Sequence, residues 1–428
     1  MGTEEEVLDP MKQWLSYGPR VPELPAAKKW HVFLSYRSVH RDWALHLYDA
    51  LTEAGFSVFL DQFRLVAGSS LATSLSQALG ESSSGVILWS TESSDSAWCQ
   101  TEYETMLNLK NQKESRFRFV VVKTDAQELP LFARTSLYED FSQSPEGPHG
   151  AGLLRVMYGL VDQPLSEAAV RFAQKVDEET KSALLQIAAA AEIGNAARLH
   201  ALGTCRTLAW LTSPVLACRA AETLIGLGER DMALAVLSAA RAKFPKSIRP
   251  KQLEALALAR AGRSSDAQLI LAELYAAGHR DPESMGIFAR TWMDRYKTSG
   301  SPRHLEKSRD LYVEAFSLAP SDYYTGINAA SKSVLLGDLA TATAVAEKVQ
   351  ALVGTALVNG DYWKTATVAE VQLIKQDYGK AAKLYRSAVT IDPEAKDNHA
   401  STLGQARLLM EKLSTPPNHR AAIEAAFT

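Results

Sequence analysis

The sequence predicts an α/β domain followed by an all-α solenoid, and three observations lead to this fold class. From Trp30 to about Leu160, short apolar runs alternate with amphipathic helical stretches, which is typical of a parallel sheet covered by helices on both faces. Beyond residue 161 the chain is rich in Ala and almost free of β-branched runs. In that second part, Pro and Ala recur about every 37 residues, as expected of a helical repeat. We therefore expect an N-terminal extension (1–28), an α/β domain (29–160) and a helical domain (161–428) with a linker helix over about 165–193.

The α/β domain is predicted to contain five parallel strands in a flavodoxin-like order. The expected strands are the apolar runs 31–35, 56–60, 85–89 and 117–122, with a short fifth at 137–141. Amphipathic helices are expected over 43–51, 70–79 and 97–109, and Gly55 ends the first of them. In such a sheet the topological switch lies between the first and third strands, and ligands bind beyond the carboxyl ends of these two strands.

The residues that leave those two strands are the candidates for a binding site. They are Ser35, Tyr36 and Arg37 after the first strand, and the segment from Ser90 to Glu102 after the third. Glu102 comes four residues after Trp98, so the two side chains share one face of a helix that begins near Ser96. A carboxylate beside an aromatic wall can bind a ribose. The alternative is that Glu102 lies in the first helical turn and only stabilises the helix dipole.

Four motifs, in the same order along the chain, resemble a Toll/interleukin-1 receptor (TIR) domain. They are HVFLSYRSVHRDWA, GFSVFLDQFRLVAGSSL, SSSGVILWSTESSDSAWCQTEYE and the stretch from ELPLFA to YEDF, and the resemblance covers roughly residues 29–160. The family includes adaptors that only self-associate and enzymes that hydrolyse NAD+. Those enzymes have a Glu four residues after a Trp or similar residue on the third helix, which corresponds here to Glu102 after Trp98.

The resemblance implies cleavage of the nicotinamide–ribose bond, giving nicotinamide and ADP-ribose or a cyclic isomer of it. Glu102 is the expected catalytic residue, which contacts the ribose or stabilises the developing oxocarbenium ion. Nicotinamide in NAD+ is already a cationic leaving group, so neither a general acid nor a metal is required, and NAD+ is a substrate rather than a cofactor. The expected substrate-binding residues are Ser35, Tyr36, Arg37, Asp61, Gly68, Ser90 and Trp98.

Several of these residues have a structural alternative that the sequence leaves open. Arg37 either binds a pyrophosphate as a bidentate donor or forms a surface ion pair. Asp61 matches the start of the family's BB loop, which contacts a neighbouring TIR domain, but an Asp there can also cap its own turn. Gly68 supplies a special backbone conformation in the same loop. Cys99 has no His close to it in the sequence, and we interpret it as a packing residue.

A helical repeat in the second part is marked by prolines. Each of Pro245, Pro282, Pro320 and Pro393 follows an Ala by five residues (Ala240, Ala277, Ala315, Ala388) and a Leu or Tyr by eight (Leu237, Leu274, Tyr312, Tyr385). The intervals of 37, 38 and 73 residues place one degenerate repeat between Pro320 and Pro393. We expect the small Ala to let paired helices approach, the larger residue to fill the groove, and Pro to close each unit.

This repeat resembles a tetratricopeptide-type solenoid. YTGINAASKSVLLGD and DYWKTATVAEVQLIKQDYGKAAKLYRSAV are also similar to the regulatory, TRAF-binding region of stress-activated mitogen-activated protein kinase kinase kinases. The resemblance implies that the helical domain binds an unknown protein or ligand. The alternative is a structural spacer that aids oligomerisation.

Charge and cysteine content indicate which partners and which cellular setting to expect. Lys and Arg number 46 against 49 Asp and Glu, for a formal charge of -3 without a basic run, which disfavours nucleic acid as a partner. The three cysteines, Cys99, Cys205 and Cys218, have no zinc-type spacing and suit a reducing, cytoplasmic setting. The N-terminus begins acidic, and no stretch is long enough to cross a bilayer, so we expect no membrane association.

The sequence thus predicts an NAD+ hydrolase that self-associates through its TIR domain and is regulated by a C-terminal helical sensor or oligomerisation domain. A role in innate immune or cell-death signalling is implied by the family resemblance. The alternative is a non-enzymatic TIR adaptor or scaffold that acts through protein–protein contacts.

Overall fold

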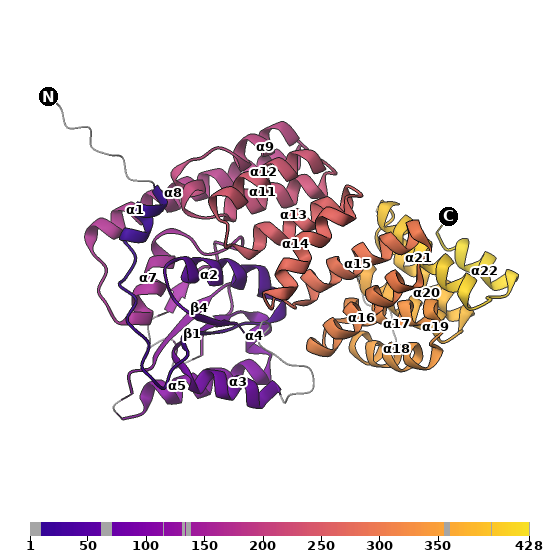
Figure 1. The fold of residues 1–428 in the computed structure, drawn as a ribbon, viewed down its shortest axis with the longest axis horizontal. Coiled ribbons are helices and arrows are strands. Elements are labelled where there is room, and N and C mark those ends of the chain that lie inside the picture. Colours follow the sequence, from indigo (N-terminus) through magenta and orange to yellow (C-terminus); the bar gives the residue numbers. More distant parts are fainter. Residues whose placement is uncertain are drawn as a thin grey trace. The chain divides into compact units, whose positions relative to one another are not determined.

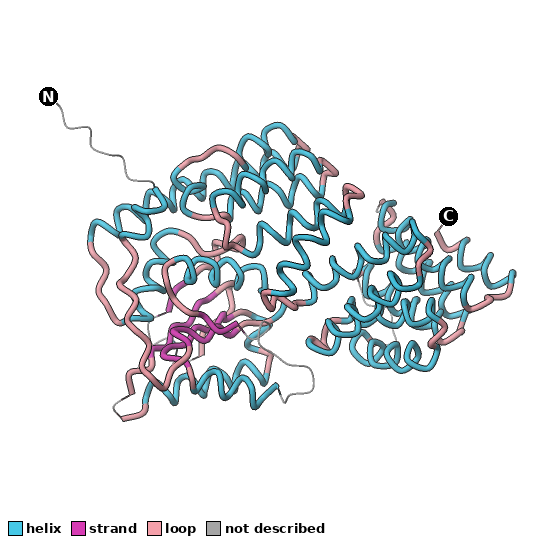
Figure 2. The backbone as a smooth tube through the Cα atoms, viewed as in Figure 1, coloured by secondary structure: helices cyan, strands magenta, loops and turns pink. Residues whose placement is uncertain are grey.

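A computed structural model describes the chain over residues 10–60, 71–113, 115–130, 133, 138–354, 360–394 and 396–427. It has an α/β domain near the N-terminus followed by helices (Figure 1; Figure 2), which confirms the predicted fold class. Within these ranges, no helix combines the length and the apolar character that a bilayer span requires.

The sheet has the predicted strand order. Its strands are β1 (Trp30–Ser35), β2 (Val58–Leu60), β3 (Ser82–Trp89), β4 (Arg118–Lys123) and β5 (Tyr138–Asp140). They lie in the order β2-β1-β3-β4-β5, and all neighbouring pairs are parallel. Because Ser35 at the end of β1 pairs with Ile87 of β3, the carboxyl ends of these two strands are neighbours.

Two strands begin two or three residues away from the predicted position, and the other strand boundaries differ by at most one residue. β2 begins at Val58 rather than at residue 56, because the amide of Phe56 donates to Leu51 O (3.0 Å) and closes the preceding helix. β3 begins at Ser82 rather than at residue 85, since Ser82 pairs with Trp30. Serines are not typical strand residues, so the apolar pattern misses the start of β3.

Helices cover both faces of the sheet. In Figure 1, α2 (Arg41–Glu53) and α7 (Gly150–Val161) lie on one side of it, and α3 (Leu71–Gly80) and α5 (Ala97–Asn111) lie on the other. Side chains that alternate along the strands supply the two cores. On the side of α3 and α5 the core includes Phe33, Phe59, Ile87, Trp89, Tyr103 and Met106.

The helical part begins with the expected linker helix, α8 (Glu167–Glu192), which Ser166 caps by accepting from Ala169 N. Trp14 and Tyr17, in and just after the N-terminal helix α1 (Pro10–Ser16), contact Phe172 of α8 with ring centroids 6.2 and 5.0 Å apart. After α8 come α9 (Ala196–Gly203), α10 (Leu208–Thr212), α11 (Val215–Gly226), α12 (Arg230–Lys243) and α13 (Ile248–Arg260).

The remaining helices follow as pairs after α14 (Ser264–Ala276). They are α15 (Pro282–Ser299) with α16 (Pro302–Leu318), α17 (Tyr323–Leu336) with α18 (Leu339–Val353), α19 (Tyr362–Ile374) with α20 (Tyr378–Ile391), and α21 (Lys396–Lys412) with α22 (Pro417–Glu424). The contacts divide the chain into two compact units, Met1–Gly262 and Arg263–Thr428. This division falls within the helical part, because α7 packs on α8 and α2 packs on α13. The expected domain boundary at residue 161 stays a prediction.

The predicted repeat matches the helix pairs except at one position. All four large repeat residues are buried, and so are three of the four Ala residues, as expected for Leu237, Leu274, Tyr312, Tyr385, Ala240, Ala315 and Ala388. Ala277 is exposed, because α14 ends at Ala276 and leaves Ala277 as its cap. Pro282 opens α15 rather than closing α14, since a Pro needs no amide partner in a first helical turn. The degenerate repeat is the pair α17–α18, which ends at Gly354 (φ 83°) instead of Pro.

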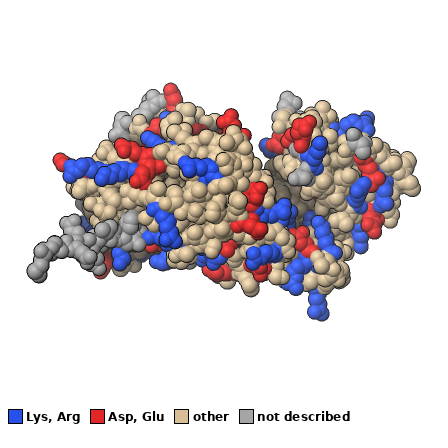
Figure 3. Space-filling model, turned by 90° about the horizontal axis from the view of Figure 1, so that it is seen from above, with Lys and Arg blue, Asp and Glu red and all other residues tan. Residues whose placement is uncertain are grey.

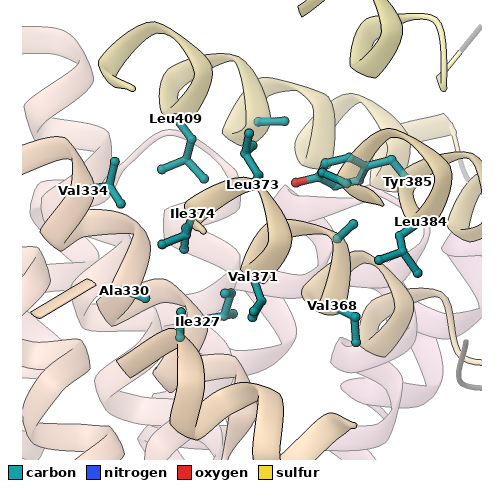
Figure 4. Packing of buried hydrophobic residues seen from close by; sticks show 14 of the residues in the cluster. Ile327, Ala330, Val334, Val368, Val371, Leu373, Ile374, Leu384, Tyr385 and Leu409 are labelled. Atoms are coloured by element: carbon teal, nitrogen blue, oxygen red, sulfur yellow. The ribbon is translucent and has the colours of Figure 1, made fainter. Parts of the chain in front are cut away.

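The second unit has its own apolar core. Figure 4 shows Val334 of α17, Ile374 of α19 and Leu409 of α21 converging in this core, and all three are buried. Stacked helix pairs bury a continuous interior in this way. On the face seen in Figure 3, acidic and basic side chains are interspersed rather than segregated by sign.

At Gly326, α17 lies close to side chains of α16 and α18. A Cβ there would lie 2.6 Å from Val349 Cγ2 and 2.8 Å from Phe316 Cε2. We expect Gly326→Leu to lower the free energy of unfolding by about 2 kcal/mol or more through overpacking. Gly404 of α21 is the matched control, because a Cβ added there would meet no other atom within 4 Å.

Gly404→Leu should leave stability unchanged or raise it by up to about 1 kcal/mol, since Leu favours helix more than Gly does. Urea unfolding followed by circular dichroism measures both changes. Equal effects of the two substitutions would contradict the close approach of α17 to its neighbours.

Candidate functional site

The predicted site lies at the topological switch of the sheet. Ser35 ends β1 and Ser90 follows β3 directly, so both are at the carboxyl edge where parallel strands present loops to ligands. The segment after β3 forms α4 (Thr91–Ser94) and then α5, the helix that carries Glu102. The sequence therefore placed the correct segments at this edge.

Helix α5 begins where the sequence predicts. Ser96 is its N-cap and accepts from Cys99 N, so Trp98 and Glu102 are both helical and one turn apart. The first turn of α5 contains no acidic residue. The alternative interpretation of Glu102 as a first-turn residue that stabilises the helix dipole is therefore wrong, because the helix starts one turn earlier than that interpretation needs.

Glu102 contacts the end of β1. Ser35 Oγ donates a hydrogen bond of 2.5 Å to Glu102 Oε2, and this contact joins residues 67 positions apart in the chain. Ser35 is buried and Glu102 is half-buried, so the carboxylate lies at the rim of the core rather than free in solvent. A hydroxyl-to-carboxylate bond of this length is in the charge-assisted range, and it restricts the orientation of the carboxylate.

The other residues after β1 extend the site. Arg37 is exposed, and its Nη1 approaches Ser96 Oγ at 3.4 Å, which brings the guanidinium to the N-terminus of α5. Tyr36 is half-buried. Ser90 is fully buried, and its Oγ accepts from Ser93 N as the N-cap of α4. Ser90 thus has a clear structural role, and its binding of substrate stays a prediction.

Three predicted residues cannot be placed completely. Asp61 and Gly68 lie outside the described residues. For Trp98 the structure describes its backbone in α5 but not its side chain. Their proposed contacts with substrate remain predictions.

The structure adds two polar pairs at the same edge that the sequence did not single out. His40, at the end of the 3-10 turn η1 (Ser38–His40), lies 3.1 Å from Glu92 Oε2. The backbone amide of Glu92 itself, followed by His40, holds the pKa of this carboxyl below its usual range. Asp125 beyond β4 accepts from both the amide and the hydroxyl of Thr91 at 2.8 Å.

These pairs connect the loops after β1, β3 and β4. Burial acts to raise the pKa of Asp125, but the bonds from Thr91 and Gln127 outweigh it and the pKa is lowered. The rule that points to the carboxyl ends of the strands applied equally to Glu92 and Asp125. The sequence contained no indication that His40 contacts Glu92 or that Thr91 contacts Asp125.

Cys99 packs in the interior, as interpreted from the sequence. Its side chain is 1% exposed, and desolvation raises the pKa of its thiol above the usual value. In the described ranges, no group of three or more His, Cys, Asp or Glu side chains is arranged to hold a metal ion.

Comparison with protein families identifies both parts of the chain. Residues 32–155 match the TIR domain family, and residues 229–336 match the family described as Tetratricopeptide Repeats-Sensor. The chain thus has a TIR domain in its N-terminal part, followed by tetratricopeptide-like sensor repeats. The similarity to the regulatory region of the kinases stays a prediction.

Two curated proteins are similar to a short stretch of the chain, and the chain spans less than a tenth of their length. The chain is 37% identical over 83 residues to the disease resistance protein RPV1 of Vitis rotundifolia, and 30% identical over 93 residues to the TMV resistance protein N of Nicotiana glutinosa. The matches cover 19% and 21% of this chain but only 6% and 8% of those proteins.

Solved structures resemble the helical part. A thermophilic TPR protein of Thermus thermophilus is 18% identical, with 44% of this chain and 96% of that chain covered and a TM-score of 0.37. YrrB, a TPR protein with an unusual peptide-binding site, is 12% identical, with 46% and 91% covered and a TM-score of 0.30.

The cysteines differ in accessibility, and this predicts their reactivity. The thiolate is the reactive form, so burial and a raised pKa both slow alkylation. We expect iodoacetamide at about pH 8 to modify the exposed Cys205 first, while Cys99 and Cys218, which are buried and whose pKa values are raised, stay protected. Peptide mass spectrometry measures the modification, and labelling in urea is the control. Fast labelling of Cys99 in the native chain would contradict its role in packing.

Proposed function

We propose that the TIR domain hydrolyses NAD+ at the bond between nicotinamide and ribose, with Glu102 as the catalytic residue. The observation that carries the proposal is the 2.5 Å contact between Ser35 and Glu102 at the carboxyl edge of β1 and β3. This contact sets a carboxylate at the position where a doubly wound sheet binds its ligands.

Cleavage of the nicotinamide–ribose bond requires few protein groups besides this carboxylate. Breaking the C1′–N bond returns the electron pair to the pyridinium nitrogen, so nicotinamide leaves as a neutral molecule. Positive charge then develops at C1′ and the ring oxygen of the ribose, and a preorganised carboxylate stabilises it. Water attacks C1′ and loses a proton, which gives ADP-ribose. Attack by a nitrogen of the adenine ring would instead give a cyclic isomer.

Ser35 and Arg37 have separate supporting roles in this proposal. Ser35 orients the carboxylate, because its hydroxyl donates to Oε2 of Glu102. Arg37 is exposed beside the N-terminus of α5, where backbone amides and the helix dipole also favour an anion, so it suits the pyrophosphate of NAD+.

The remainder of the chain supplies regulation and assembly. TIR domains generally self-associate and tetratricopeptide repeats bind proteins, so we propose that the sensor repeats receive a protein or small-molecule signal that controls the TIR domain. Both curated relatives are named as resistance proteins, which supports a role in immune signalling.

Nicotinamide release from NAD+ tests the proposal. We expect the full chain to release nicotinamide, and Glu102→Gln to lower the rate by about 100-fold or more, as for loss of a preorganised electrostatic group. Ser35→Ala should lower it by about tenfold, because it removes one hydrogen bond to a charged group. Chromatography at low and high protein concentration measures the rate and distinguishes ADP-ribose from a cyclic product.

The matched control is Glu104→Gln. Glu104 lies on the same helix but is exposed, two residues from Glu102 and therefore on the opposite face. The Glu104→Gln variant should release nicotinamide at the wild-type rate. If neither the full chain nor the isolated 29–160 segment releases nicotinamide at any concentration, the hydrolase proposal fails and the adaptor alternative stands.

A further inference from the structure

The face of α2 that meets the helical part of the first unit is polar. Asp42, His46 and Asp49 follow one another at intervals of four and three residues, so they share one face of the helix. His46 and Asp49 are each only 7% exposed. A permanent core is normally apolar, whereas interfaces that open and close within a chain are more polar. We define this contact between α2, α11 and α13 as the polar border.

Two carboxylates, one from each part, accept hydrogen bonds from the other part. Asp49 of α2 accepts from the amide of Ile248, at 3.0 Å, in the first turn of α13. Asp177 of α8 accepts from the amide of Ala151, at 2.9 Å, in the first turn of α7, and it also lies 2.7 Å from His149 Nδ1. Each part thus caps a helix of the other, which orients the two precisely without requiring a large apolar contact.

Arg249 closes the polar border. Its guanidinium is 6% exposed by side chain and pairs with Asp42 of α2 at 2.8 Å and with Glu222 of α11 at 2.6 Å. One buried cation on α13 therefore pairs with α2 of the α/β domain and with α11. Removing one partner of such a pair leaves the others poorly compensated, so the border responds strongly to small changes.

Closing the border has an electrostatic cost. Desolvation raises the pKa of Asp49 to about 8, although amides of Ile248 and Arg249 act to lower it. Desolvation and then Arg249 lower the pKa of His46 to about 3. A partly open pocket of about 220 Å³ also lies at the border, lined among others by Trp43, His46 and Cys218. Burying the ionisable side chains of Asp49 and His46 therefore offsets part of the free energy that the closed state gains from its other contacts.

The border lies close in sequence to the candidate site. Asp42 is in the first turn of α2, five residues after Arg37 and seven after Ser35. The intervening turn η1 is held to the loop after β3 through His40 and Glu92. Residues 36–40 join Ser35, the last residue of β1, to α2, so a shift of the N-terminus of α2 would act directly on the segment next to the residue that orients Glu102.

We propose that the polar border is a releasable clamp, in which Arg249 and Asp49 hold α2 in the closed state and thereby restrain turnover at Glu102. This regulation rests on the proposed hydrolase function. In the closed chain, α13 holds one face of α2 at Asp42 in its first turn and at Asp49 seven residues further along. A signal received by the helical part opens the border, and the segment 36–40 that follows Ser35 then adapts to substrate.

Two substitutions open the clamp from opposite sides. Asp42→Arg places a second cation beside Arg249 at a position that is half-exposed, so the α/β domain retains its core. Glu222→Lys does the same from α11 without touching the α/β domain itself. The control is Asp231→Lys, the same charge reversal in the exposed first turn of α12. All are made in the full chain, and thermal unfolding checks that each folds.

Hydrogen–deuterium exchange and nicotinamide release are measured on the same samples. We expect both border variants to speed exchange in α2 and in the first turn of α13, and to raise turnover between about 5- and 150-fold, the range of typical coupling between sites. Asp231→Lys should change neither.

Faster exchange with unchanged or lower turnover, in a chain whose wild type is active, would overturn the clamp as a restraint. Unchanged exchange in both border variants would overturn the border as a releasable contact. Absence of nicotinamide release from every variant, with exchange changed as expected, would instead show that the hydrolase proposal had failed, and the restraint of turnover with it.

Discussion

The parallel pairing of β1 with β3 is the constraint on which the candidate site depends. It sets Ser35 beside the loop that leads into α5, and so brings a hydroxyl and a carboxylate from distant parts of the chain within hydrogen-bonding distance. Because helices cover both faces of the sheet, its carboxyl edge is the part left to ligands. The site is therefore a consequence of strand order more than of any single motif.

Buried polar contacts join the TIR domain to α8, α11 and α13. Reciprocal caps by Asp49 and Asp177, with Arg249 between two carboxylates, give this border direction and specificity. Apolar cores also lie against one face of the sheet and between the helix pairs. Such a contact can change while each part keeps its own core, as the proposed regulation requires.

The repeat positions marked in the sequence differ in how strictly each residue type is required. The large residue at each repeat position is buried in every case, whereas the Ala and Pro positions vary with the local end of each helix. Filling the groove between paired helices needs volume at one position, while closing a unit can be done by Pro or by a Gly with positive φ such as Gly354.

The sequence by itself determined the fold class, the strand order, the start of α5 just after Ser96 and the place of Glu102 on that helix, because periodicity, caps and apolar runs are local signals. It missed the start of β3, where three serines give no apolar signal. It also began β2 too early, because the amide of Phe56 donates to the end of the preceding helix instead of to a strand. Only the tertiary structure decided that Ser35 bonds Glu102, that His40 meets Glu92 and that Asp49 caps α13. These partners are far apart in sequence, and no local pattern records which polar side chain will be buried against which.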